Sequence, residues 1–255
     1  KEINEKGGVL GRPLELLIRD CKGTPDEATR VARELILKEN VLFLVGGLTA
    51  SQGLALSELA KNEKIIYIAP ISQSTAMTEP ANLHPYVFRT AANTNTSGRG
   101  GATNIAKNPW KRVYTIGPDY EYGQKTIGAF VPWLKKIKPE VEIIGQGWPK
   151  LAEADYTPFI TALLAAKPEA VFSCLWGGDF VNFSKQARPY GFYEKVKVVS
   201  AGEAGSPETA MALKDDMPLG ITTNAYDLFY YPNTPEHVAY VNRLKAYTKQ
   251  EYPPS

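Results

Sequence analysis

The sequence predicts an α/β protein with two doubly wound units, each built on a parallel sheet. Short β-prone runs alternate with helical patterns along the chain, and polar or glycine-rich loops follow many of these runs. The chain is also long, with 255 residues. Because single hydrophobic cores stop growing near about 250 residues, two units explain this length better than one large sheet.

The first unit opens with a repeated strand-then-helix pattern. The β-prone run from Leu14 to Ile18 precedes Thr24 and Pro25, a pair typical of the cap and first turn of a helix that reaches about Lys38. The same alternation continues beyond this helix. It predicts strand 41–45, helix 51–62, strand 65–69 and, after a long loop, helix 96–107.

The second unit follows the same pattern with more strands. Its elements are strand 113–117, helix 122–136, strand 141–147, helix 156–166, strand 170–174, helix 179–190, and strands 196–200 and 221–224. We expect the chain to cross between the units near 91–95 and near 222–227, so that the last helix, 235–249, returns to the first unit. The expected lobes are residues 1–93 with 226–255, and residues 94–225.

The composition of the chain argues against nucleic-acid binding, a membrane span and a metal site. Lys and Arg number 29 against 27 Asp and Glu, and the basic residues form no stripe, so we expect no nucleic-acid partner. The apolar runs are far shorter than the roughly 18 residues that a membrane span requires. Cys21 and Cys174 stand without a CxxC pair or nearby histidines, which predicts two unpaired thiols, no metal site and no cofactor.

We find no residues arranged for catalysis. His84 lies in a proline-flanked loop and His237 near an exposed helix start, where both are expected to be solvated structural residues. The sequence has no HExxH, GxSxG or Walker loop, and the glycines at 98–101 lack the spacing of a dinucleotide fingerprint. The sequence therefore predicts a protein that is not an enzyme.

Polar side chains follow the strands of the first unit at their carboxyl ends, where open α/β sheets place a ligand crevice. Strand 41–45 is followed by Thr49, Ala50 and Ser51. We expect Ser51 to cap the next helix, where free N–H groups and a hydroxyl suit a carboxylate; a capping role alone is the alternative. Strand 65–69 is followed by a second polar loop. That loop contains Ile71, Ser72 and Gln73.

Aromatic and acidic residues occupy the matching positions of the second unit. Residues 119–123 follow a strand and contain Tyr122, which offers an aromatic face to a ligand. Trp176 and Glu203 follow two further strands. Each residue alone fits a core or turn position, but together they predict a binding crevice.

Residues 2–12 read EINEKGGVLGR and resemble the EIN-x-x-GGVLGR entry of type I periplasmic solute-binding proteins, in the branched-chain amino-acid (leucine/isoleucine/valine)-binding family of ABC importers. The resemblance extends over nearly the whole chain, including residues 69–70, 119–123 and 176–178. It implies two Rossmann-like lobes joined by a three-stranded hinge that close over a solute. Against this pattern the chain is expected to be truncated at both ends.

The resemblance also assigns roles to residues. It implies that Ala50 and Ser51 hold the ligand carboxylate, with Ile71 and Gln73 beside them, and that Tyr122 covers the ligand from the other lobe. Glu203 stands where amino-acid binders place the carboxylate that receives the ammonium group. Gln73 and Trp176 replace the threonine and tyrosine usual in the group, which leaves the class of ligand side chain open.

The function implied is an extracytoplasmic receptor that captures a small apolar or aromatic carboxylate. An amino acid, branched-chain or aromatic, is the first expectation, and an aromatic acid without an amino group, benzoate-like or cinnamate-like, is the alternative. A ligand-sensing domain of a receptor or regulator would use the same lobes. The expected partner is an ABC permease in the inner membrane. We expect a monomer located in the periplasm, or outside the cell as a membrane-tethered lipoprotein.

Overall fold

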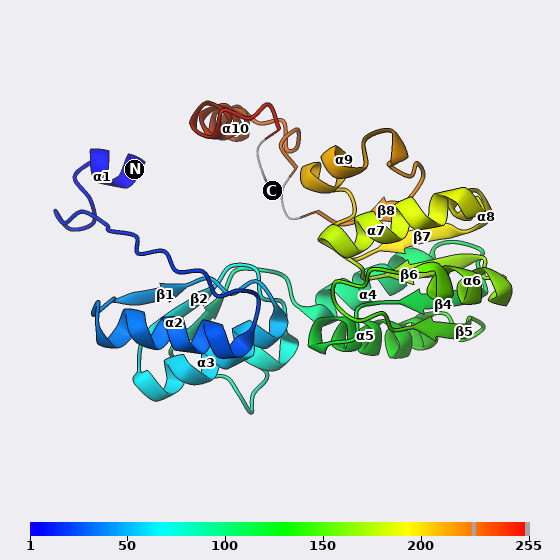
Figure 1. Ribbon diagram of the computed structural model, residues 1–255, viewed down its shortest axis with the longest axis horizontal. Coiled ribbons are helices and arrows are strands. Elements are labelled where there is room, and N and C mark those ends of the chain that lie inside the picture. Colours follow the sequence, from blue (N-terminus) through cyan, green and yellow to red (C-terminus); the bar gives the residue numbers. More distant parts are fainter. Residues whose placement is uncertain (226–227, 253–255) are drawn as a thin grey trace. The chain divides into compact units, whose positions relative to one another are not determined.

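The computed structural model describes residues 1–225 and 228–252, which divide into two compact units, Lys1–Ala91 and Ala92–Ser255 (Figure 1). The first boundary lies within the crossing expected near 91–95. The second expected crossing ends at Tyr226 and Asp227, which lie outside the described residues. The assignment of residues 226–255 to the first lobe therefore stays a prediction. No helix in the described part of the chain is long and apolar enough to span a membrane.

Unit 1 contains a three-stranded parallel sheet. Its elements are α1 (Glu2–Glu5), α2 (Pro25–Leu37), β1 (Phe43–Val45), α3 (Ala50–Glu63), β2 (Ile66–Ala69), a 3-10 turn (Thr75–Thr78) and β3 (Val87–Arg89). The strands run in the order β1-β2-β3, with Phe43 opposite Ile66 and Tyr67 opposite Val87. β3 lies inside the region that the sequence analysis interpreted as a long loop.

Side chains alternate between the two faces of this sheet. Leu44, Tyr67 and Val87 are buried in a core shared with apolar residues of α2 and α3. On the opposite face, Phe43 is 51% exposed and Val45 is 62% exposed. The described residues of unit 1 therefore cover one face of the sheet and leave apolar side chains on the other.

The strand predicted at Leu14 to Ile18 is wrong. The segment pairs with no strand among the described residues, and Leu16 and Ile18 are 78% and 77% exposed. Asn4 holds its first residue instead, because the Asn4 amide donates to the Leu14 carbonyl and its side-chain oxygen accepts from the Leu14 N–H, both at 2.8 Å. A β-prone run forms a strand only where a neighbouring strand pairs with its backbone groups.

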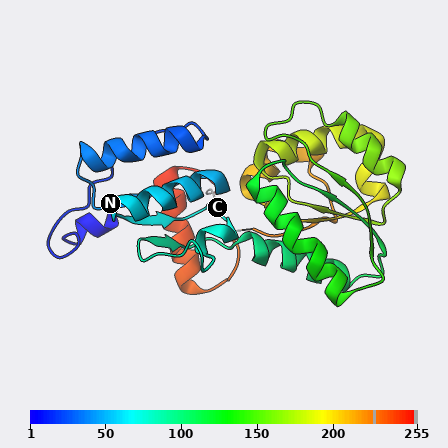
Figure 2. The same cartoon turned by 90° about the horizontal axis from the view of Figure 1, so that it is seen from below.

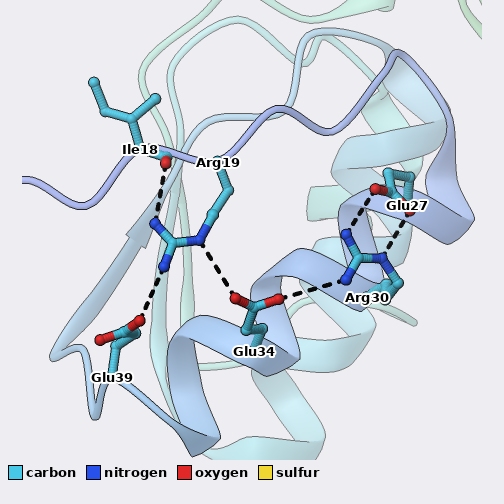
Figure 3. A network of polar contacts seen from close by, with 6 residues as sticks. All are labelled: Ile18, Arg19, Glu27, Arg30, Glu34 and Glu39. Carbon is cyan, nitrogen blue, oxygen red and sulfur yellow. Dashed lines mark hydrogen bonds and ion pairs between the residues drawn. The ribbon is translucent and has the colours of Figure 1, made fainter.

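A network of exposed ion pairs links the end of this segment to α2 (Figure 3). Arg19 lies 2.9 Å from Glu39 and 3.5 Å from Glu34. Glu34 also pairs with Arg30, at 3.4 Å, and Arg30 donates two hydrogen bonds to Glu27. Exposed pairs of this kind add little to stability.

Unit 2 contains a five-stranded parallel sheet. Its helices are α4 (Thr94–Ala106), α5 (Glu121–Ile137), α6 (Thr157–Ala166), α7 (Gly177–Ala187), α8 (Phe192–Lys195), α9 (Pro207–Leu213) and α10 (Pro235–Thr248), with 3-10 turns at Arg188–Tyr190 and Lys214–Asp216. Its strands are β4 (Arg112–Ile116), β5 (Glu142–Gly147), β6 (Ala170–Ser173), β7 (Lys197–Ser200) and β8 (Thr222–Thr223).

The strand order β5-β4-β6-β7-β8 contains one reversal. The chain passes from β4 outward to β5 and then returns to place β6 on the other side of β4. Helices cover both faces of the sheet, with α4 and α5 on one side and α6 and α7 on the other (Figure 2). On the first side Phe130 of α5 stacks on Phe172 of β6, with ring centroids 3.9 Å apart. The neighbouring Val171 faces the second core, with Phe180 of α7. The predicted parallel α/β fold is confirmed.

The alternation predicted for unit 2 is confirmed, with differences at the ends of elements. Two short helices were missed, α8 and α9. α9 begins after Ser206, whose hydroxyl accepts from the Thr209 N–H at 3.2 Å, and Pro207 occupies its first turn. A serine followed by proline is a recognisable helix start. α9 is short, with only seven residues.

Close packing of α3 against the loop after β2 gives a testable prediction. A Cβ at Gly53 would lie 2.5 Å from the Ser72 Cβ and 2.6 Å from the Met77 Cε. We therefore expect Gly53→Ala to lower the free energy of unfolding by about 1–3 kcal/mol. The control is Gly128→Ala in α5, where a Cβ meets nothing within 4 Å and should stabilise the helix by up to about 1 kcal/mol. Urea unfolding followed by circular dichroism measures both, and equal midpoints would contradict the packing.

Candidate functional site

In unit 1 the loop after β1 leads directly into the capped start of α3. Thr49 is the N-cap residue, and its hydroxyl accepts from the Gln52 N–H at 3.2 Å. The Gln52 side-chain oxygen in turn accepts from the N–H groups of Leu48 and Thr49, at 3.0 and 3.1 Å. Gln52 also donates to Cys21 and to the Thr24 carbonyl, so the starts of α2 and α3 are held together. This capping box fixes the position at which α3 begins.

The structure corrects the predicted role of Ser51 as the cap of this helix. Thr49 takes that role because glutamine three residues later completes a capping box, which Ser51 cannot form from within the first turn. Neither the N–H groups of Ala50 and Ser51 nor the Ser51 hydroxyl has a hydrogen-bond partner among the described residues. These groups remain at the positive end of a 14-residue helix, the arrangement that binds a carboxylate.

The polar loop after β2 binds the start of α3 through hydrogen bonds. Ser72 is fully buried, and its hydroxyl lies 2.9 Å from the Gly47 carbonyl and 3.0 Å from the Thr49 carbonyl. The buried Tyr67 hydroxyl donates to the Gly46 carbonyl at 2.9 Å. Both hydroxyls therefore bind carbonyls of the loop that precedes α3. Ser72 thus has a structural role, because it holds the loop that leads into α3.

The neighbours of Ser72 in this loop differ in exposure. Gln73 is buried, with 6% of its surface exposed, whereas Ile71 is 40% exposed. Of the two, Ile71 therefore offers apolar surface to solvent or to a ligand. Binding roles for both residues stay predictions.

In unit 2 Tyr122 joins two loops at the carboxyl edge of the sheet. It lies in the first turn of α5, after β4, and its hydroxyl donates to the Ala201 carbonyl, after β7, at 2.9 Å. Only 5% of its surface is exposed. The phenol is therefore engaged within the protein, and the role as ligand cover implied by the resemblance stays a prediction.

Tyr120, two residues earlier, lies in the predicted segment 119–123 but was not among the predicted binding residues. It is the N-cap residue of α5, and its hydroxyl accepts a hydrogen bond from the Trp176 indole N–H at 3.1 Å. Trp176 is the N-cap residue of α7, after β6. Burial raises the pKa of the Tyr120 phenol, so this group stays neutral at physiological pH. The signal in the sequence was available, because Tyr120 and Trp176 each come directly before a helix that follows a strand.

Glu203 is held in a defined backbone position after β7. Its φ is +58°, its N–H donates to the Asn224 side-chain oxygen at 3.1 Å, and its carbonyl accepts from the Ser206 N–H at 2.9 Å. The preceding Gly202 has no room for a side chain, since a Cβ there would lie 1.9 Å from the Leu175 carbonyl oxygen. The loops after β6 and β7 are therefore in backbone contact, and Glu203 lies at the same edge as Trp176.

The histidines and cysteines lie in structural settings. His84 Nδ1 accepts from the Tyr86 N–H at 3.3 Å, so its Nε2 donates to Ser57 at 3.0 Å. Both cysteines are free thiols, and burial raises the pKa of Cys174 well above the ordinary range. Within residues 1–225 and 228–252 no group of three His, Cys, Asp or Glu side chains is placed to hold a metal ion. What the two units offer is an anion-binding helix start in unit 1 and an aromatic and acidic edge in unit 2.

Comparison with known proteins identifies relatives of the chain. The profile of a family described as "Periplasmic binding protein" matches residues 1–255. The Leu/Ile/Val-binding protein BraC3 of Rhizobium johnstonii is 23% identical over 235 residues, which cover 91% of this chain and 62% of that protein. The chain thus spans less than two thirds of the length of this curated relative.

Solved structures share the fold. A solute-binding protein of an ABC transporter from Rhodopseudomonas palustris, in complex with 3,4-dihydroxybenzoic acid, is 26% identical with a TM-score of 0.87, and the match covers 98% of this chain and 68% of that one. A second solute-binding protein from R. palustris, in complex with benzoate, is 22% identical with a TM-score of 0.88, covering 99% and 68%. The second likeness shows the fold alone.

Substitution by alanine should affect stability differently at Ser51, in the first turn of α3, and at Ser72, in the loop after β2. Ser72→Ala removes the buried hydroxyl that holds the Gly47 and Thr49 carbonyls, and we expect it to lower the free energy of unfolding by about 1–3 kcal/mol. Ser51→Ala removes a hydroxyl without a partner and should change stability by less than about 0.5 kcal/mol. Urea denaturation of both variants measures the difference. A larger loss for Ser51→Ala than for Ser72→Ala would show that the two roles are reversed.

Proposed function

Because the chain belongs to the periplasmic binding protein family, we propose that it is the ligand-capturing part of an extracytoplasmic solute-binding receptor of an ABC importer. The ligand is a small carboxylate with an apolar or aromatic side chain, and an amino acid is the first candidate. The protein binds and releases this ligand unchanged, so its role is not catalytic.

The observation that carries this proposal is the start of α3. Two backbone N–H groups and one hydroxyl, at Ala50 and Ser51, are left without partners by a capping box that uses Thr49 and Gln52. A helix start of this kind stabilises a negative charge through the N–H groups and the helix dipole. Ser72 and Tyr67 bind carbonyls of the loop before α3, so these carbonyls are already engaged within the protein. A carboxylate is the simplest small ligand that satisfies all three donors.

Glu203 supports an amino acid as the ligand. Its backbone is fixed at the carboxyl edge of the unit 2 sheet, and a carboxylate there is suited to receive an ammonium group. The curated relative from R. johnstonii is a Leu/Ile/Val-binding protein by name. Both points favour a ligand that carries an amino group as well as a carboxylate.

A second candidate is an aromatic acid without an amino group. The observation in its favour is Trp176, a large flat side chain at the carboxyl end of β6 whose indole N–H is bound to Tyr120. The relative from R. palustris that is 26% identical was solved with 3,4-dihydroxybenzoic acid. In this case the Glu203 carboxylate would make no contact with the ligand.

The remaining parts of the proposal concern partners and location. We propose that the protein works outside the cytoplasm, in the periplasm or tethered to a membrane as a lipoprotein, and delivers its ligand to an ABC permease. It acts as a monomer, and nucleic acid is not among its partners. The names of its relatives support the importer role.

The carboxylate assignment predicts the effect of Ser51→Ala on binding. Loss of a hydrogen bond to a charged group should weaken ligand binding by about 1.5–3 kcal/mol. Isothermal titration calorimetry with L-leucine and benzoate, at matched salt, measures the change for whichever probe binds. Thr103→Ala serves as the control, because the Thr103 hydroxyl is occupied within α4 of unit 2. Unchanged affinity in Ser51→Ala would remove this serine from the site.

The choice between the two ligand classes predicts the effect of Glu203→Gln. An amino-acid receptor should lose roughly 2 kcal/mol or more of binding free energy, because the ammonium group loses a charged partner. A receptor for plain aromatic acids should be little affected. Calorimetry with L-leucine, L-phenylalanine and benzoate distinguishes the two. Tight binding of wild-type protein only to acids without an amino group would exclude the first candidate while leaving the receptor role in place.

A further inference from the structure

Tyr120 and Trp176 form a hydrogen-bonded pair in unit 2. The sheet order β5-β4-β6-β7-β8 reverses between β4 and β6. Tyr120 follows β4 and Trp176 follows β6, so the pair bridges the carboxyl ends of the two strands at the reversal. Open α/β sheets bind their ligands at this position.

The hydrogen bond fixes how the indole is presented. An indole has one N–H donor, and here it is directed to the Tyr120 hydroxyl at 3.1 Å. The Trp176 backbone is fixed as well, because its carbonyl accepts from the Asp179 N–H at 3.1 Å in the first turn of α7. The indole is half-buried, so part of its surface remains accessible in a set orientation.

The Tyr120 hydroxyl keeps a proton to donate. A phenol has one proton and can accept through its lone pairs, and the bond from Trp176 uses only the acceptor side. No described residue accepts the Tyr120 proton. The phenol is therefore a neutral donor beside a fixed aromatic surface, half-buried at the edge of the sheet.

Tyr122 differs from Tyr120 in all these respects. The two rings lie 6.1 Å apart between centroids, but the Tyr122 hydroxyl donates to the Ala201 carbonyl and its side chain is almost completely buried. Tyr122 therefore joins the loops after β4 and β7, which leaves Tyr120 as the tyrosine whose donor remains available at the reversal.

The backbone next to Tyr120 and Trp176 is closely packed at two glycines. A Cβ at Gly117 would lie 2.4 Å from the Cys174 sulfur, and a Cβ at Gly123 would lie 2.0 Å from the Pro118 carbonyl oxygen. Ser173 Oγ accepts from the Leu175 N–H at 3.2 Å and so fixes the turn before Trp176. The strand ends that carry both aromatic residues are therefore closely packed.

From these observations we propose that Tyr120 is a specificity-determining positioning residue, which holds Trp176 so that the site favours carboxylates bearing a planar ring over aliphatic ones. The inference rests on the proposed receptor function and specifies its ligand class. A fixed indole face stacks with a flat ring at the offset geometry that aromatic pairs prefer, whereas a branched aliphatic chain gains no such orientation-dependent contact.

The experiment measures the affinity of wild-type protein and Tyr120→Phe for benzoate, 3,4-dihydroxybenzoate, L-phenylalanine and L-leucine by calorimetry. We expect wild-type protein to bind at least one ring-bearing probe more tightly than leucine. Tyr120→Phe should lose about tenfold in affinity for that probe, about 1.4 kcal/mol, and less than about twofold for leucine. The matched control is Tyr193→Phe, which removes another hydrogen-bonded phenol of unit 2, paired with Ser184 at 2.7 Å on α7.

A double-mutant cycle separates positioning from general damage. If Tyr120 acts by holding the indole, Tyr120→Phe should have no further effect on ring selectivity in a Trp176→Leu background. Equal losses for all probes, additive effects of the two substitutions, or a wild-type preference for leucine would overturn the inference while leaving the receptor function standing. Wild-type protein that binds none of the four carboxylates would overturn the proposed function together with the inference.

Discussion

The candidate site in unit 2 lies at the carboxyl edge of its sheet and depends on the parallel pairing of β4 with β6. This pairing puts Val113 opposite Ala170 and Ile116 opposite Ser173, so both strands end at the same level. The pairing of β6 with β7 extends the same edge to the loop that carries Glu203. If the strands slipped by one residue, the loops would no longer meet and the buried faces would be exchanged. The positions of Tyr120, Trp176 and Glu203 all follow from this register.

The two units hold the loops at the carboxyl ends of their strands by different interactions. Unit 1 uses hydrogen bonds from side chains, with Thr49 and Gln52 closing the start of α3 and Ser72 holding the loop carbonyls. Unit 2 relies more on close backbone packing, which glycine makes possible at Gly117 and Gly202. Polar support leaves specific N–H groups free, and tight packing fixes the direction of aromatic rings. The first arrangement suits recognition of a charge, and the second suits recognition of a shape.

Most of the fold could be predicted because strand and helix patterns alternate clearly in unit 2, where the middle residues of β6 and β7 are apolar, Val171 with Phe172 and Val198 with Val199. The prediction failed at Leu14 to Ile18, since β propensity does not show whether a partner strand exists. It also placed the cap of α3 at Ser51, because both Thr49 and Ser51 are favourable capping residues. The Thr-x-x-Gln spacing of a capping box was the signal in the sequence that favoured Thr49.

The residue-level site was harder to predict than the fold. Tyr120 and Tyr122 are both tyrosines after the same strand, and the choice between them depends on which hydroxyl finds a carbonyl in a loop about 80 residues later. Spacing along one helix cannot reveal that contact. The Tyr120 to Trp176 bond likewise joins residues that are adjacent only because the sheet reverses between β4 and β6.

The uncovered sheet face of unit 1 affects how this protein can be handled. Parallel sheets are normally buried on both faces, yet Phe43, Val45 and Phe88 are each more than half exposed. These exposed fractions belong to the whole described chain and not to unit 1 alone, so the surface is open to water even when unit 2 is present. Protein made of these 255 residues should therefore tend to associate with other copies of itself at high concentration, so binding studies are better done in dilute solution.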